Sequence, residues 1–218
     1  MAYGETMEKL NPCGDGEILA LLGRYCPAPA TLLDAGCGRG DRLRALAAAA
    51  PHTALYGLDR DGENAAAAAA ACPAAEILCG DIAAPPWGDG TFDAVLCECT
   101  LSLTDDPAKS LERLARLLRH GGLLLLGDLC APGGAAPLAL DSSGGLRWLL
   151  FRDWVETGAQ AAGFRLLEYI DRREALLNMA AQMILDGSFC DCVGPAGAAA
   201  LKAHRGGYGL WLLRKETD

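Results

Sequence analysis

Short apolar runs alternate with helical patterns along most of this chain. Seven of the runs have the length and composition of buried strands, and each is bounded by glycine, proline or acidic residues. Between them, apolar residues recur at helical spacing. We predict strands at Thr31–Asp34, Ala54–Asp59, Ala75–Cys79, Phe92–Cys97, Leu123–Asp128, Arg165–Ile170 and Tyr208–Arg214, and helices at Glu17–Tyr25, Asp41–Ala50, Glu63–Cys72, Lys109–His120, Trp154–Ala162, Arg172–Leu185 and Ala196–His204.

This alternation predicts an α/β fold, a doubly wound and mostly parallel seven-stranded sheet with helices on both faces. The length of 218 residues suits one domain. We divide it into a cap segment (1–30), a core (31–130) and a C-terminal half (131–218). Gly187–Cys192 is expected to be a loop.

Three glycines follow the first predicted strand at alternate positions, in the order Asp34-x-Gly36-x-Gly38-x-Gly40. A chain that passes from strand to helix within a few residues needs positive φ and bare backbone, which glycine supplies. The dinucleotide fingerprint G-x-G-x-x-G places its third glycine one residue later, so the spacing disfavours an NAD-dependent reductase. Asp34 would repel a diphosphate but suits a cationic ligand.

This stretch resembles the first motif of class I S-adenosylmethionine-dependent methyltransferases, whose cofactor carries a sulfonium and an ammonium. The resemblance implies that the cofactor lies along the turn, so we assign Asp34, Gly36, Cys37, Gly38 and Gly40 to its site.

Two further acidic residues end the next two predicted strands. Asp59 lies about twenty residues after the glycines, where nucleotide-binding βαβ units place a ribose-binding carboxylate. The resemblance implies that Asp81 takes the adenine amino group, and that the backbone of Ile82 meets a ring nitrogen. We add Arg60, beside Asp59, to the predicted cofactor-binding residues.

The run from Pro85 to Asp93 resembles small-molecule methyltransferases of menaquinone and ubiquinone biosynthesis, and the strand after it ends in Cys97-Glu98-Cys99. Ligands bind beyond the carboxyl ends of such strands. We therefore assign Cys97 to the cofactor, Glu98 to catalysis or to contact with the cofactor's ammonium, and Cys99 and Ser102 to the substrate side.

The resemblance also implies that the segment before the core helps to form the acceptor pocket. We expect that pocket between the end of the fourth strand, the segment before Gly16 and the loop Ala131–Gly145, with Asn11–Asp15 as a candidate lid. An ordinary exposed turn is the alternative for Asn11–Asp15.

The net charge of −9 and the lack of a Lys/Arg cluster disfavour nucleic acid as a partner. No signal peptide or membrane-spanning run is visible, so we expect a cytoplasmic protein that acts on a small molecule. The sequence predicts no particular oligomeric state.

Ten cysteines include no C-x-x-C pair, so we predict no metal site and expect reduced structural thiols. Two C-x-C pairs, Cys97/Cys99 and Cys190/Cys192, leave an alternative open. Residues two apart on a strand share a face, and thiolates are soft ligands. The chain resembles arsenite methyltransferases in fold, so a metalloid acceptor is one alternative. A cofactor-binding regulator without catalysis is the other.

Overall fold

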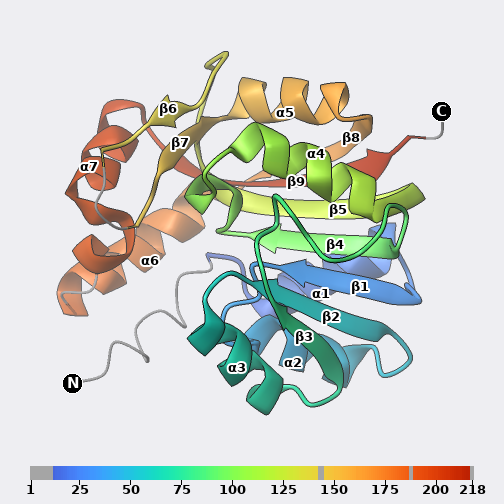
Figure 1. The fold of residues 1–218 in the computed structure, drawn as a ribbon. Coiled ribbons are helices and arrows are strands. Elements are labelled where there is room, and N and C mark those ends of the chain that lie inside the picture. The colour runs from blue at the N-terminus through green and yellow to red at the C-terminus, as the bar shows by residue number, and fades with distance from the viewer. Residues whose placement is uncertain (1–11, 142–144, 187–188, 217–218) are drawn as a thin grey trace.

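The computed structural model describes residues 12–141, 145–186 and 189–216, without the side chains of 182–184 and 186–192. One twisted sheet, covered by helices on both faces, forms its centre (Figure 1). The strands are β1 (Thr31–Ala35), β2 (Ala54–Asp59), β3 (Ala75–Cys79), β4 (Phe92–Glu98), β5 (Leu118–Ala131), β6 (Leu138–Ala139), β7 (Trp148–Phe151), β8 (Phe164–Asp171) and β9 (Gly207–Lys215). The helices are α1 (Asp15–Tyr25), α2 (Asp41–Ala49), α3 (Gly62–Ala71), the 3-10 turn η2 (Leu101–Leu103), α4 (Pro107–Leu117), α5 (Arg152–Ala161), α6 (Arg173–Asp186) and α7 (Phe189–Ala203).

The predicted mostly parallel sheet is confirmed and contains all seven predicted strands, within a sheet of nine in the described part of the chain. Strands β3-β2-β1-β4-β5 are parallel in that order, β9 pairs antiparallel with β5, and β8 pairs antiparallel with β9. Two short strands, β7 and β6, are added where β5 extends past its neighbours. The chain reverses its direction of winding between β1 and β4, and ligands bind beyond the strand ends at such a switch point.

Separate apolar clusters cover the two faces of the sheet. One contains Leu111 of α4 and Val155 of α5, and the other contains Ile18 of α1, Leu43 of α2 and Leu176 of α6. Helices α2 and α3 approach closely, because a Cβ at Gly40 would lie only 2.9 Å from the Cα of Ala68. Gly40 therefore fixes helix packing, and its positive φ of 87° starts α2.

The loop expected at Gly187–Cys192 is wrong for residues 189–192. These residues belong to α7, in which Gly194 is non-helical (φ 72°) and is followed by Pro195. The sequence predicted a separate helix at Ala196–His204, after this loop. Proline is tolerated in the first turn of a helix, so a second helical segment can begin directly after the kink at Gly194.

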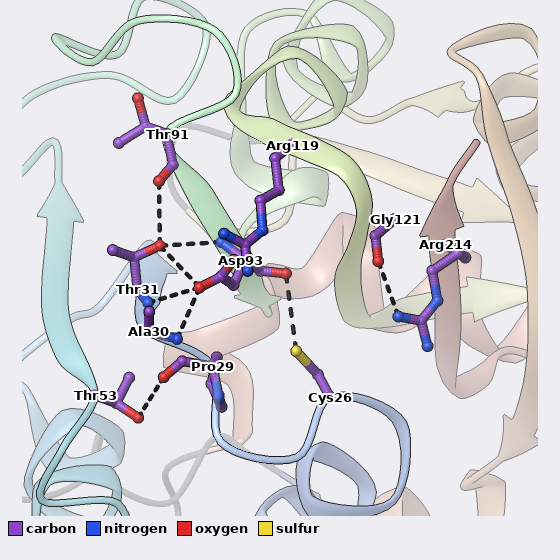
Figure 2. A network of polar contacts seen from close by, with 10 residues as sticks. All are labelled: Cys26, Pro29, Ala30, Thr31, Thr53, Thr91, Asp93, Arg119, Gly121 and Arg214. Atoms are coloured by element: carbon purple, nitrogen blue, oxygen red, sulfur yellow. Dashed lines mark hydrogen bonds and ion pairs between the residues drawn. The ribbon is translucent and has the colours of Figure 1, made fainter. Parts of the chain in front are cut away.

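A polar network lies at the amino ends of β1 and β4, on the side of the sheet opposite the strands' carboxyl ends (Figure 2). One carboxylate oxygen of buried Asp93 accepts from the backbone N–H of Ala30 at 2.7 Å and of Thr31 at 3.0 Å. The other oxygen forms an ion pair with Arg119. The network thus joins the start of β1 to the start of β4.

Asp93→Asn should lower the free energy of unfolding by about 2–4 kcal/mol, because it weakens two hydrogen bonds to a buried charge and its ion pair. Chemical denaturation measures this change. Asp89→Asn is the matched control, since Asp89 pairs with Arg116 on the surface and should change stability by less than about 1 kcal/mol. Equal losses in the two variants would contradict a structural role for the Asp93 network.

Candidate functional site

A cavity of about 310 Å³ lies at the carboxyl ends of β1, β2, β3 and β4. Six of the predicted cofactor-binding residues line it, together with Glu98 and Cys99. The six are Gly36, Gly38, Asp59, Arg60, Asp81 and Ile82. The strand ends therefore bring together residues that lie far apart in the sequence.

Backbone hydrogen bonds fix the glycine turn at the floor of this cavity. Gly36 N–H and Cys37 N–H both donate to Leu58 O, at 2.7 and 3.0 Å. Gly36 has a positive φ of 88°, and a Cβ there would lie 2.8 Å from the Cβ of Thr100. At Gly38, in contrast, a Cβ would meet no atom within 4 Å. The turn therefore leaves open space beside Gly38 for a ligand.

The carboxylate of Asp59 is held in place by the turn that it faces. One oxygen accepts from Gly38 N–H at 2.8 Å and the other from Asp61 N–H at 2.9 Å. Asp81 is oriented similarly, since it accepts from Ala83 N–H at 2.8 Å. Each carboxylate oxygen has a second lone pair, so both side chains can accept further bonds from a ligand.

The charge of this cavity is strongly negative. Asp59, Asp61, Asp81 and Glu98 line it, whereas Arg60 is the single cationic side chain among the described lining residues. Such a cavity repels a pyrophosphate and favours a ligand with positive charge. The negative charge of the cavity agrees with the prediction, drawn from the glycine spacing and Asp34, that the ligand is cationic and carries no diphosphate.

Glu98 is joined to the N-terminal segment through Arg42, which is 9% exposed. Arg42 Nε and Nη2 both lie 2.9 Å from Glu98 Oε2. The same guanidinium forms an ion pair with Asp15 and donates to Cys13 O at 3.1 Å. Asp15 and Cys13 belong to the expected lid, so that part of it is bound to the site, whereas Asn11 lies outside the described residues.

Asp34 does not line the cavity; it is 5% exposed beneath it. Burial, reinforced by the negative charge of Glu98, raises the pKa of Asp34 to about 7, against the opposing influence of Arg42. Its carboxylate is therefore a site of unfavourable negative charge that a cationic ligand would stabilise.

Cys97 and Cys99 do not share a face, which corrects the expectation from strand alternation. Cys97 is fully buried in the cluster that includes α4 and α5, whereas Cys99 packs against the cluster on the other face. The strand ends at Glu98 and Cys99 adopts a positive φ of 50°, which reverses the direction of its side chain. A non-glycine residue with this φ gives no signal in the sequence.

The predicted cofactor residues Cys37 and Cys97 bury their thiols and do not line the cavity. Burial raises the pKa of the Cys37, Cys97 and Cys99 thiols above the usual range. No group of three or more His, Cys, Asp or Glu in the described part of the chain could hold a metal ion. The side chains of Cys190 and Cys192 lie outside the described residues. The thiols of Cys37, Cys97 and Cys99 therefore do not favour a metalloid acceptor.

A second cavity of about 570 Å³ adjoins the first, since Cys99 and Leu103 line both. Ser102 also lines this cavity and is buried. The N–H and the hydroxyl of Ser102 donate to the two carboxylate oxygens of buried Asp128, at 2.9 and 2.6 Å. Burial raises the pKa of Asp128 to about 6, although the bonds from Ser102 oppose this rise. Asp128 ends a predicted strand, and that position could have identified it.

Helices α6 and α7 form the outer wall of this second cavity. We expected the acceptor pocket to be covered by Ala131–Gly145, but none of the described residues of that loop lines the cavity. Hydrophobic periodicity predicted the helix α6, but it did not show where in the fold α6 packs. Part of α7 was expected to be a loop. The lining residues that this prediction missed include Leu129, Leu146, Arg173, Leu176, Ala180, Lys202 and Arg205.

Residues 33–126 match the family model described as a methyltransferase domain. Among curated proteins, the demethylmenaquinone methyltransferase of Thermotoga maritima is 30% identical over 104 residues, which are 48% of this chain and 45% of that protein. The chain spans less than half the length of the curated relatives it matches.

Solved structures share the fold across nearly the whole chain. The crystal structure of the [4+2]-cyclase SpnF has a TM-score of 0.74 at 21% identity, covering 94% of this chain and 82% of that one. Geranyl diphosphate C-methyltransferase from Streptomyces coelicolor A3(2), in complex with S-adenosyl-L-homocysteine, has a TM-score of 0.72 at 13% identity, covering 92% and 77%. No helix among the described residues is long and apolar enough to cross a membrane.

Proposed function

We propose that this chain transfers a methyl group from S-adenosylmethionine to a small-molecule acceptor. Residues 33–126 match a methyltransferase domain, and geranyl diphosphate C-methyltransferase is among the structures that share the fold. One observation carries the proposal: the open glycine turn and the oriented carboxylates of Asp59 and Asp81 line the same cavity. When bound, the cofactor supplies a methyl group on a positively charged sulfur.

The residues of the cavity suit the parts of this cofactor. Asp59 is assigned to the ribose hydroxyls and Asp81 to the adenine amino group, with Ile82 as an apolar wall. The bare backbone at Gly36 and Gly38 accommodates the amino-acid portion. Glu98, fixed by Arg42, is assigned to the cofactor's ammonium rather than to proton transfer, because one of its oxygens is already bound by the guanidinium.

For methyl transfer, the protein must chiefly hold the acceptor atom in line with the methyl group and the sulfur of the cofactor. The second cavity meets the first at Cys99 and Leu103, so we place the acceptor in the second cavity. This arrangement favours an organic acceptor over a metalloid, because the walls are mainly apolar and Cys99, the one cysteine among the described lining residues, has a thiol pKa raised by burial. A cytoplasmic location and a single domain stay predictions from the sequence.

Incubation with methyl-labelled S-adenosylmethionine and a cell extract tests the proposal. We expect label in a small molecule, and at least about tenfold slower transfer by an Asp59→Ala variant at a cofactor concentration well below the Kd of the original protein. Saturable cofactor binding without any labelled product would instead support the non-catalytic regulator. Binding of NAD in place of S-adenosylmethionine in a calorimetric titration would contradict the assignment of the cavity.

The pKa of Asp34 predicts that cofactor affinity depends on pH. A raised pKa means that the folded protein holds a proton that the unfolded chain loses near pH 4, so this group lowers stability as pH rises from about 4 to 7. A bound cation favours ionised Asp34, so binding releases the proton. S-adenosylmethionine should therefore bind more tightly at pH 8 than at pH 6, by up to about tenfold.

Calorimetric titration at the two pH values measures this effect. The matched variant Asp34→Asn keeps the shape but cannot titrate, so its affinity should be nearly equal at pH 6 and pH 8. The same pH dependence in both proteins would show that another group is responsible.

A further inference from the structure

The walls of the second cavity are mainly apolar, but three cationic side chains lie at one part of its rim. Arg173 begins α6, Lys202 lies in the last turn of α7, and Arg205 follows that helix by two residues. Arg173 donates to the backbone O of Arg205, so the two helix ends are in contact. In a chain of net charge −9, this grouping is distinctive.

No carboxylate in the described part of the chain forms an ion pair with these three cations. Asp128 is the single acid among the described lining residues, and Ser102 and Leu129 N–H occupy its oxygens. Asp171 lies nearby and accepts from the backbone N–H of Arg173, which leaves the guanidinium charge in place. The charge that the described side chains give to this part of the cavity is therefore positive.

The positive rim is separated from the cofactor cavity along β5. Cys99 N–H donates to Gly127 O at the junction of the two cavities. Arg173 packs against Gly207, which pairs with Cys130. Gly127 and Cys130 are three positions apart on this strand, which corresponds to a rise of about 10 Å.

We propose that the methyl acceptor is an elongated apolar molecule with an anionic group, carboxylate or phosphate, at about 10 Å from the methylated atom. The inference rests on the proposed function, since it defines the substrate class of the same site. The apolar walls bury the body of the acceptor, while Arg173, Lys202 and Arg205 bind its anion. The opposite end then reaches Cys99 and Leu103.

Four probes with the same ten-carbon chain test this proposal by calorimetry: decanoate, decyl phosphate, decanol and decylamine. The two anions should bind at least about tenfold more tightly than decanol, and decylamine should bind most weakly. Similar affinities for both anions would define the site as a general anion site, and tighter binding of one of them would identify the group. Equal affinities for decanol and decanoate would overturn the proposal.

Lys202→Glu should reduce the preference for anions over decanol by at least about fivefold. Lys109→Glu is the matched control, because Lys109 is an exposed lysine on α4 that lines neither cavity. It should leave the preference unchanged. An equal effect of the two variants would attribute the preference to overall charge and contradict the assigned rim.

Ala180→Trp tests whether the probes occupy this cavity, because Ala180 lines it and a large side chain would fill it. Probe binding should be lost while affinity for S-adenosylhomocysteine stays within about twofold of that of the original protein. Retained probe binding would place the probes elsewhere. If the original protein did not bind S-adenosylhomocysteine, the proposed function would be contradicted. If it bound S-adenosylhomocysteine but showed no preference for anionic probes, only this inference would be contradicted.

Discussion

Asp59→Ala should weaken S-adenosylmethionine binding by about 1.5–3 kcal/mol, or about 10- to 150-fold in Kd. The loss has two physical sources. The ribose hydroxyls lose a charged acceptor, and Gly38 N–H loses the carboxylate that orients the turn. Calorimetric titration of the folded variant measures the change.

Asp41→Ala is the matched control, since Asp41 is an acid at the start of α2 that pairs with Arg44 and does not line the cavity. Its effect on Kd should be less than about threefold. If Asp59→Ala bound the cofactor with unchanged affinity, the assignment of this cavity would be wrong.

Gly36→Ala should be still more damaging. The added Cβ would meet Thr100 at 2.8 Å from its Cβ, and the residue would have to keep a φ of 88°. Overpacking and left-handed backbone together should lower the free energy of unfolding by about 3 kcal/mol or more. The displaced turn should also abolish cofactor binding in whatever folded protein remains.

Gly121→Ala separates strain from overpacking. Gly121 has a φ of 76°, yet a Cβ there would meet no atom within 4 Å. Gly121→Ala should lower the free energy of unfolding only by the cost of a left-handed backbone at a non-glycine residue, about 1–2 kcal/mol, and should leave cofactor affinity unchanged. Comparable losses of stability in the two variants, measured by chemical denaturation, would contradict the packing of Gly36 against Thr100.

The sequence predicted the cofactor side of the site because its residues sit at strand ends. Apolar runs defined the strands, and parallel strands bring their carboxyl ends to one edge, so Asp59 and Asp81 had to lie close to the glycine turn. Each assignment depended on local order along the chain. It did not require knowledge of how distant helices pack.

The acceptor side depended on features that local patterns do not encode. The positions of α6 and α7 follow from packing against β9 and β7, and neither contact is visible in periodicity. Arg42 lies on α2 and is buried because Glu98 and Asp15, from distant parts of the chain, pair with it. Cys99 is rotated by a positive φ that only the surrounding structure can impose.

A crystal structure of the protein with S-adenosylhomocysteine tests the central claim most directly. We predict that the ligand lies along Gly36 and Gly38, with its ribose hydroxyls within hydrogen-bond distance of Asp59 and its adenine beside Asp81 and Ile82. A ligand bound outside the cavity at the ends of β1 to β4, or inside it with no contact to Asp59 and Asp81, would contradict the account.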